Sequence, residues 1–558
     1  MKHNWWDDKI AYQIYPKSFY DSNNDGIGDI RGIIEKLDYL QDLGINLLWI
    51  SPFYPSPLAD NGYDISDYYG VDPRFGSMAD LDELINLAKE KDIDIILDLV
   101  VNHCSDEHEW FKKACADPDG PFGKFFYIED YIDGENLPTN WRSYFGGSCW
   151  EKLPGHDDKV YMHVFHKKQP DLNWENPDLR QELYKMINWW LEKGIAGFRI
   201  DAISNIKKHI PYKNYPVDRE DGLASMYLML QDTHGIGEFL QEMADNTFKK
   251  YYAFTVGEVC DEKDSELQSF IGNDGYFSSM FDFSASLLGI FDDKKKTMPA
   301  ITGEDYKNAI FTEHKKLEGI GRLSNIIENH DQPRGVSHYI PMADLNDKSK
   351  KMLAGIYFML PGIPFIYQGQ EIGMENLDSV DNLADLDDCA NEDLYTNVIN
   401  CGLSKEYALQ VVAKFSRDNA RTPFQWSNEE NAGFSKVKPW LMVNPKYKTI
   451  NYMGQKDNPD SVFNFYKALI NLRKDPLYKD IFIYGSFTPY EENTKNLVAY
   501  LREYEGKTLL ILANFQNKEL QLTLPKNPSN LLISNTGNEG CSDTTLALEP
   551  YDYYIFEL

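Results

Sequence analysis

Gly197-Phe198-Arg199-Ile200-Asp201-Ala202 is the stretch that decides the fold. Residues 195–200 form an apolar run that ends next to an arginine and a carboxylate separated by one residue. Side chains two positions apart in a strand point to the same face, so Arg199 and Asp201 are predicted to share one site. A strand that ends on ionisable groups is typical of a parallel barrel, in which the chemistry is done at the carboxyl ends of the strands.

Three other strand-like runs end on polar side chains in the same way. They are residues 93–101, which lead into Asn102-His103; residues 254–256, which lead into Gly257-Glu258; and residues 323–327, which lead into Glu328-Asn329-His330-Asp331. Because the carboxyl ends of parallel strands meet on one face, these groups are predicted to surround a common site.

The spacing of apolar residues alternates between strand and helix in the first two hundred residues. Helical patterns at residues 33–43 and 81–91 separate short apolar runs, which predicts parallel βα units. The alternation is interrupted at residues 104–174, a stretch rich in Gly, Pro, Asp and aromatics that is predicted to be inserted after the third strand. A long polar insertion is expected at residues 378–421. From about residue 480 the period changes to two, which predicts an all-β terminal domain.

The charge of the chain excludes several kinds of partner. Its 558 residues include 88 acidic and 56 basic side chains, which gives a formal net charge of −32. Such a surface repels phosphate backbones and anionic lipids, so neither nucleic acid nor a membrane is expected to bind. No apolar run has the length of a signal peptide or of a membrane-spanning helix. We therefore expect a cytoplasmic protein.

The cysteines support a reducing compartment. There are seven, an odd number without a CxxC pair: Cys104, Cys115, Cys149, Cys260, Cys389, Cys401 and Cys541. Wide spacing of this kind predicts free thiols and gives no zinc site.

The segment Asp21-Ser22-Asn23-Asn24-Asp25-Gly26-Ile27-Gly28-Asp29 resembles the start of a calcium loop. Oxygen ligands at alternate positions suit a hard cation, so a structural Ca²⁺ or Mg²⁺ is predicted, with ligands from Asp21, Asn23, Asp25, Ile27 and Asp29. The twelfth position is Gly32 in place of a bidentate glutamate, and the flanks are strand and helix, so the loop is not an EF-hand. A metal-free loop of Asx turns is the alternative.

Four segments carry a resemblance to a known family: Asp98-Leu99-Val100-Val101-Asn102-His103, Gly197-Phe198-Arg199-Ile200-Asp201, Gly257-Glu258-Val259 and Asn329-His330-Asp331. They resemble the signature segments of the α-amylase superfamily of glycoside hydrolases (family 13). Residues 169–174 and 416–423 narrow the resemblance to its oligo-1,6-glucosidase and α-glucosidase branch. The resemblance implies an α/β fold: a (β/α)8 TIM barrel at residues 1–103 and 175–479, an inserted domain at 104–174 and a C-terminal β-sandwich at 480–558. It also implies a small oligosaccharide substrate and no organic cofactor. The expected assembly is a monomer or a weak homodimer.

The residues themselves suit the hydrolysis of an acetal, which needs a proton donor and an electron-rich group on opposite faces of the sugar. Asp201 is the predicted nucleophile, because Arg199 on the same strand face would hold it ionised. Glu258 has no basic neighbour in sequence, so burial is expected to raise its pKa and make it the general acid. A separation of about 5 Å between the two carboxyls would mean retention of configuration. The resemblance gives Asp331 the role of holding the sugar hydroxyls and favouring the transition state.

Further residues are predicted to form the walls of the pocket. His103 and His330 would hydrogen-bond the same sugar. Tyr63 and Asp64 are expected to bind the far end of a terminal glucose, and an Arg417–Asp64 pair would close that end, so that single glucoses are removed. The inserted domain would contribute Phe145, Phe165 and Gln169, although aromatics in such a segment also form small cores. Asp98 is interpreted as mainly structural.

The linkage specificity is left open by one residue. In the resembling branch, valine after the nucleophile accompanies α-1,6 preference and smaller residues accompany α-1,4, whereas this chain has Ala202. We expect an exo-acting α-glucosidase with α-1,6 slightly favoured. The alternatives are an α-1,4-specific maltase and a glucosyl-transferring or sucrose-isomerising enzyme. A trehalose-6-phosphate hydrolase would need a basic phosphate pocket, for which Lys167-Lys168 is insufficient. A non-catalytic transporter subunit would need a membrane span and altered carboxylates.

Overall fold

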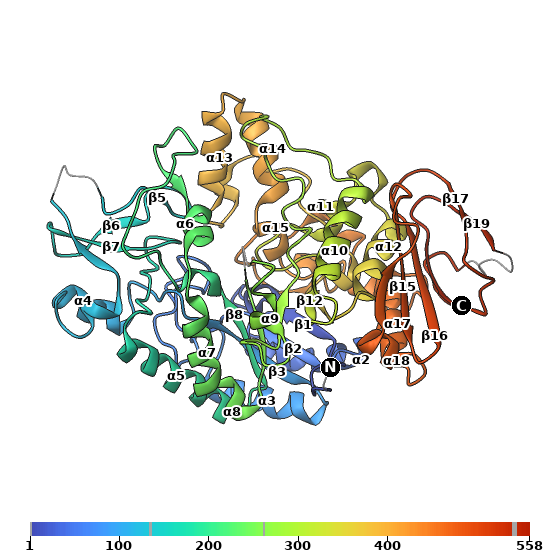
Figure 1. Ribbon diagram of the computed structural model, residues 1–558, viewed down its shortest axis with the longest axis horizontal. Coiled ribbons are helices and arrows are strands. Elements are labelled where there is room, and N and C mark those ends of the chain that lie inside the picture. Colours follow the sequence, from blue (N-terminus) through green and yellow to red (C-terminus); the bar gives the residue numbers. More distant parts are fainter. Residues whose placement is uncertain (1–2, 133–136, 260–262, 538–543) are drawn as a thin grey trace.

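Eight parallel strands close into a barrel at the centre of the computed structural model (Figure 1). The structure describes residues 3–132, 137–259, 263–537 and 544–558. Around the barrel the strands are β1 (Ala11–Ile14), β13 (Ile363–Tyr367), β12 (Leu323–Asn325), β11 (Ser279–Phe281), β10 (Phe254–Gly257), β8 (Gly197–Asp201), β3 (Asp94–Val100) and β2 (Leu47–Ile50). The helices between them include α3 (Met78–Glu90), α5 (Pro177–Glu192), α7 (Ile236–Asn246), α10 (Gly303–Lys316), α12 (Asp347–Phe358) and α17 (Val462–Lys474). The predicted TIM barrel is confirmed.

The opening motif lies on β8, between β3 and β10. Arg199 is in register with Asp98 on one side and Val256 on the other. Gly197 has φ +155°, and a Cβ there would lie 1.7 Å from the carbonyl oxygen of Phe254. A side chain at this position would therefore push β8 and β10 apart, and with them the groups at their ends.

The inserted domain follows β3, as expected. It contains a three-stranded sheet of β4 (Ile128–Asp130), β7 (Lys159–Met162) and β6 (Trp150–Lys152). A further strand, β5 (Trp141–Arg142), pairs with β9 (Ala224–Ser225), which comes after β8 in the chain. Met226 and Met229 of α6 (Met226–Asp232) then pack into the same apolar cluster as Trp141. A segment outside the predicted limits of 104–174 thus completes this domain.

The insertion at residues 378–421 forms two helices, α13 (Asn391–Asn400) and α14 (Lys405–Phe415), at the top of Figure 1. It is not only polar, because Val398, Ala408 and Val411 form a small core with Phe291. The insertion returns to the barrel through α15 (Asp418–Arg421), directly after Arg417.

The C-terminal domain is all-β, as predicted. After α18 (Lys479–Tyr484), a five-stranded sheet runs in the order β14 (Ser486–Pro489), β15 (Leu497–Tyr504), β16 (Lys507–Asn514), β20 (Tyr553–Glu557) and β18 (Asn530–Ser534). A second sheet pairs β17 (Leu520–Thr523) with β19 (Thr545–Leu548), and leucines of both sheets share one core.

Within the described residues, no helix has both the length and the apolar character needed to cross a membrane. The five cysteines that the structure describes, Cys104, Cys115, Cys149, Cys389 and Cys401, are free thiols. Cys260 and Cys541 lie outside the described residues.

Candidate active site

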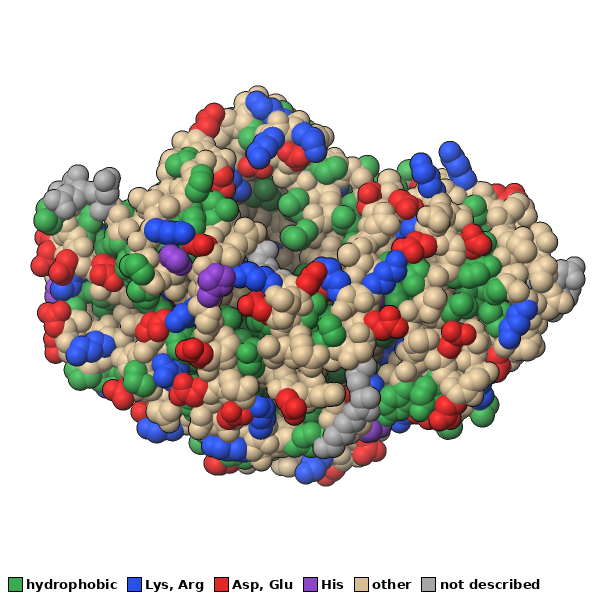
Figure 2. Space-filling model, viewed as in Figure 1, with side chains coloured by type: hydrophobic (Ala, Val, Ile, Leu, Met, Phe, Trp, Pro, Cys, Tyr) green, Lys and Arg blue, Asp and Glu red, His purple; other side chains and the backbone are tan. Residues whose placement is uncertain are grey.

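A pocket of about 230 Å³ lies at the carboxyl ends of the barrel strands. Its lining residues are Asp60, Tyr63, His103, Tyr144, Phe145, Phe165, Asp201, Ala202, Ser204, Asn205, Tyr227, Glu258, Asp331 and Arg417. Eight of the predicted site residues are among them: Tyr63, His103, Phe145, Phe165, Asp201, Glu258, Asp331 and Arg417. The face shown in Figure 2 is hollowed below the lobe that contains α13 and α14. The three acids, far apart in sequence, therefore converge on one pocket.

Arg199 contacts three carboxylates, although it lies behind the pocket wall and is fully buried. Its Nη1 donates to Asp98 at 2.7 Å and to Asp201 at 2.6 Å. Its Nη2 lies 2.9 Å from Oε2 of Glu258, which also accepts a hydrogen bond of 2.8 Å from the backbone N–H of Ala202. One guanidinium thus fixes the positions of Asp201 and Glu258 relative to each other.

The pKa of Asp201 differs from the prediction. Burial raises the pKa of Asp201, Arg199 lowers it, and the charges of Glu258, Asp98 and Asp331 raise it again, so that the pKa lies well above its usual value. Arg199 therefore does not outweigh burial and the neighbouring carboxylates, as the sequence had predicted it would. Glu258 has no basic neighbour in sequence, but in the structure it contacts Arg199.

Asp331 is ionised over the physiological range. Burial opposes this, but His330, Arg417 and Arg421 together lower the pKa of Asp331 well below its usual value. Arg417 and Arg421 reach Oδ1 at 3.0 and 2.8 Å, and Nε2 of His330 lies 2.9 Å from Oδ2. Gln13 donates to Nδ1 of His330 at 2.8 Å, which leaves the proton on Nε2, facing Asp331. Asp331 therefore contributes a fixed negative charge to the site.

The far end of the pocket is closed by Arg417, but the predicted partner is wrong. Arg417 pairs with Asp60 at 3.1 Å and with Asp388 at 2.6 Å. Asp64 is fully buried in the loop below, where it accepts hydrogen bonds from Ser56 and from the backbone N–H groups of residues 59 and 60. The sequence offered two carboxylates four positions apart, and the hydrogen bonds of the loop decide which one faces the pocket.

Two predicted binding residues, Gln169 and His330, support the pocket from behind. Gln169 is buried and donates to Asp60 at 3.1 Å, and its amide nitrogen lies 3.0 Å from Nε2 of His103. His330 stacks on Tyr63, with ring centroids 5.1 Å apart and planes at 10°. Tyr63 also donates to Asp98 at 2.9 Å, which fits the structural role assigned to Asp98.

Several pocket residues were missed. Tyr227 comes from α6, so only the pairing of β5 with β9 could have placed it beside Tyr144. Asp388 of the insertion pairs with Arg417, and Arg421 of α15 contacts Asp331. A signal for Arg421 existed, because it lies four residues after Arg417 in a short helical turn.

The acidic loop before α1 (Ile30–Glu35) is closed by its own backbone. Asp21 accepts from the N–H of Gly26 at 2.8 Å, Asp29 accepts from Gly32 at 2.6 Å, and Asp25 accepts from the backbone two residues later. In the part of the chain that the structure describes, no three His, Cys, Asp or Glu side chains come together as metal ligands. This geometry matches the Asx-turn alternative, and the bound cation stays a prediction.

Comparison with known proteins agrees with this arrangement. The alpha amylase catalytic domain matches residues 13–483, and the C-terminal domain of alpha-amylase SusG matches residues 497–553. The chain belongs to the α-amylase family of glycoside hydrolases. It is 39% identical to an oligo-1,6-glucosidase of Bacillus cereus over the whole of both chains. Two solved structures also match over the full length of both chains. One is a trehalose-6-phosphate hydrolase of Bacillus licheniformis, with 37% identity and a TM-score of 0.90. The other is an isomaltulose synthase of Klebsiella sp. LX3, with 34% identity and a TM-score of 0.93.

Proposed function

We propose that this glycoside hydrolase is a retaining, exo-acting α-glucosidase that releases glucose from the non-reducing ends of short α-gluco-oligosaccharides, with α-1,6 linkages favoured. The observation that carries the proposal is the convergence of Asp201, Glu258 and Asp331 on a pocket whose far end is filled by the Arg417–Asp60 pair. Its volume of about 230 Å³ lies below the roughly 300–1,000 Å³ of pockets for drug-sized ligands. One sugar ring fits beyond the bond that is cut.

In the proposed reaction Asp201 attacks the anomeric carbon and forms a glucosyl ester, while Glu258 protonates the departing oxygen. Both carboxylates contact the same guanidinium, that of Arg199, and this arrangement supports the close pair of acids that retention requires. Water activated by Glu258 then hydrolyses the ester, and the fixed charge of Asp331 favours the positive transition state.

The α-1,6 preference is supported by the oligo-1,6-glucosidase relatives, of which that of Bacillus cereus covers the whole chain. Ala202 lines the pocket beside Glu258, on the side where the leaving sugar would lie. Its backbone is left-handed, with φ +44°, a conformation that a β-branched residue adopts only under strain. A small residue here leaves room for more than one linkage.

A phosphorylated disaccharide is the second candidate substrate, because of a neighbouring cavity of about 530 Å³. Ser204 lines both this cavity and the active-site pocket. Lys207, His234 and Lys263 also line the cavity, and a phosphate on the leaving sugar would need cations of this kind. Lys207 is already paired with Glu175, which makes this the weaker candidate.

Initial rates on isomaltose, maltose, sucrose and trehalose 6-phosphate test the proposal, with the anomer of the released glucose followed by NMR. We expect isomaltose to be cleaved fastest, with α-glucose as the first product. β-Glucose as the first product would overturn retention, and a strong preference for maltose would overturn the α-1,6 assignment. Preferential cleavage of trehalose 6-phosphate would establish the second candidate, and conversion of sucrose into an isomer would establish transfer.

A further inference from the structure

A large cavity lined by described residues is separate from the active site. It measures about 580 Å³ and shares no lining residue with the catalytic pocket. Its walls come from α11 (Gly335–Tyr339), from the segment after β13 and from α14. They are largely aliphatic, with contributions from Ile301, Ile340, Leu345, Leu377, Val380 and Leu409. A volume of this size, with apolar walls, is typical of a site for a small organic molecule.

Two polar groups in this cavity lack a side-chain partner among the described residues. His338 is 8% exposed, and its imidazole has no side-chain hydrogen-bond partner, only the nearby backbone of Leu288. Burial lowers the pKa of His338 to about 4, Lys414 acts in the same direction and the backbone of Leu288 opposes both, so the ring is neutral. Buried polar groups are usually hydrogen-bonded, so this imidazole is suited to a ligand that supplies the missing partner.

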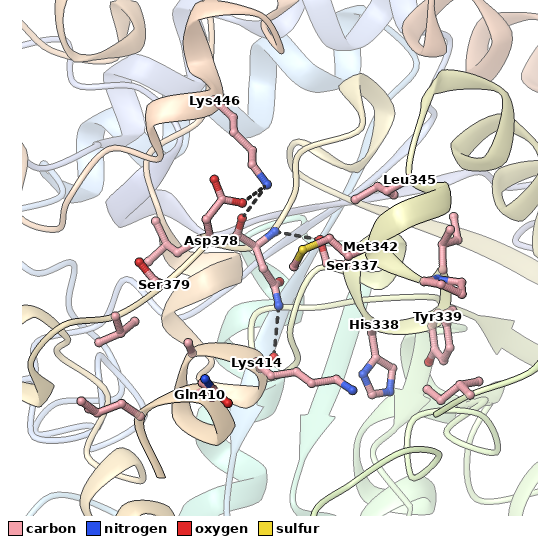
Figure 3. Close-up of a pocket in the computed structure, with 18 of the residues that line it drawn as sticks. Ser337, His338, Tyr339, Met342, Leu345, Asp378, Ser379, Gln410, Lys414 and Lys446 are labelled. Atoms are coloured by element: carbon pink, nitrogen blue, oxygen red, sulfur yellow. Dashed lines mark hydrogen bonds and ion pairs between the residues drawn. The ribbon is translucent and has the colours of Figure 1, made fainter. Parts of the chain in front are cut away.

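Lys414 provides the charge. It is partly buried on α14, burial lowers its pKa, and its ammonium lies 5.3 Å from the ring of Phe415. No carboxylate of the described residues pairs with it, whereas Lys446 across the cavity is neutralised by Glu375 at 2.7 Å and by Asp378 at 2.6 Å. Figure 3 shows the side chains of Lys414 and His338 pointing toward each other from α14 and α11.

We propose that this cavity is a second binding site, for a small amphipathic monocarboxylate with an aliphatic body. The carboxylate would pair with Lys414 and accept a hydrogen bond from His338, and the aliphatic chain would lie against Leu345, Leu377 and Leu409. The acidic side chains of the lining are Asp378, Asp381 and Glu406, and all three are exposed. Asp378 is paired with Lys446, and no carboxylate affects the pKa of Lys414. The interior of the cavity is therefore positively charged. An uncharged sugar would leave that charge unpaired.

Isothermal titration calorimetry with octanoate, and with octanamide as the neutral analogue, tests the proposal on the full chain. We expect octanoate to bind at one site, and octanamide to bind at least about tenfold more weakly because it lacks the charge-assisted bond. Lys414→Met should weaken octanoate binding by a similar factor. Gln410→Trp should abolish it by filling the cavity from an exposed position on α14. Lys405→Met, an exposed lysine of the same helix outside the lining, is the matched control and should bind as the parent does.

Four results would overturn the proposal. Equal affinity for octanoate and octanamide would show that the carboxylate does not pair with Lys414. Unchanged binding by both the Lys414→Met and Gln410→Trp variants would show that the ligand binds elsewhere. Displacement of octanoate by isomaltose would show that it occupies the catalytic pocket. No heat of binding at millimolar octanoate would refute the site outright. All of these readouts are independent of the proposed glucosidase activity.

Discussion

Replacing Glu371 with glutamine should change how stability depends on pH. Glu371 is fully buried behind β13, where it accepts a hydrogen bond of 2.7 Å from Tyr12 and another from Tyr39. Burial raises the pKa of Glu371 from 4.5 to about 7, against the lowering effect of the two hydroxyls. The folded state therefore binds this proton more strongly than the unfolded chain does. Stability from this group is complete below the unfolded pKa and is lost as the pH rises through 7.

The free energy of unfolding falls by about 3 kcal/mol as Glu371 ionises, since a shift of one pKa unit corresponds to about 1.4 kcal/mol. For a chain of this length, this loss of stability lowers the Tm by about 3 °C. A Glu371→Gln variant keeps an oxygen for Tyr12 and Tyr39 but does not ionise. Its Tm, measured by differential scanning fluorimetry, should rise relative to that of the parent by about 3 °C between pH 5 and pH 8.

Glu375→Gln is the matched control with the opposite sign. Burial raises the pKa of Glu375, but Lys350 and Lys446 lower it further, so that it lies below its usual value. Relative to the parent, this variant should lose stability as the pH rises from the lowered pKa of Glu375 to its usual value of 4.5, and the difference should then stay constant from pH 5 to pH 8. A difference between Glu371→Gln and the parent that stays constant from pH 5 to pH 8 would refute the assignment of the raised pKa to Glu371.

Four further outcomes are expected. Asp201→Asn should lose about 10⁴-fold or more in kcat on isomaltose with an unchanged Tm, because an amide cannot form the glucosyl ester; activity within tenfold of the parent would exclude Asp201 as nucleophile. Asp60→Asn should raise KM by about tenfold with little change in Tm, whereas Asp64→Asn should mainly lower Tm; the reverse pattern would restore the Arg417–Asp64 pair. Ala202→Val should raise the ratio of isomaltose to maltose hydrolysis several-fold, and an unchanged ratio would separate this position from linkage choice. EDTA should lower Tm and Ca²⁺ restore it if the loop at residues 21–29 binds a cation, and identical melting curves would favour the metal-free loop.

The barrel could be predicted from the sequence because its signals are local. Each apolar run that ends on polar residues forms a strand with an ionisable group at its carboxyl end. Examples are β8 with Asp201 and the residues after β10 and β12. Parallel strands require these ends to meet, so the convergence of the acids followed from topology alone.

The partners of the site residues could not be predicted, because they depend on contacts between distant segments. Arg199 neighbours Asp201 in sequence, but its contact with Glu258 arises only when β8 and β10 pair. The same contact gives Glu258 a basic neighbour in space that it lacks in sequence. Likewise, Tyr227 reaches the pocket only because β9 adds to the inserted domain.

In the proposed function, Arg417 affects both the length of the substrate that the pocket accepts and the rate of the reaction. Its Nη2 holds Asp60 and Asp388, which fills the far end of the pocket, while its Nη1 holds Asp331, the charge that favours the transition state. A planar guanidinium can serve these groups in fixed directions, which a lysine ammonium cannot. Opening the pocket to longer chains by removing this side chain would therefore also release Asp331 on one side, leaving Arg421 and His330 to hold it. In the proposed function, exo-specificity and rate are therefore coupled through a single residue, so a variant that gains access to internal linkages at this position should lose kcat at the same time.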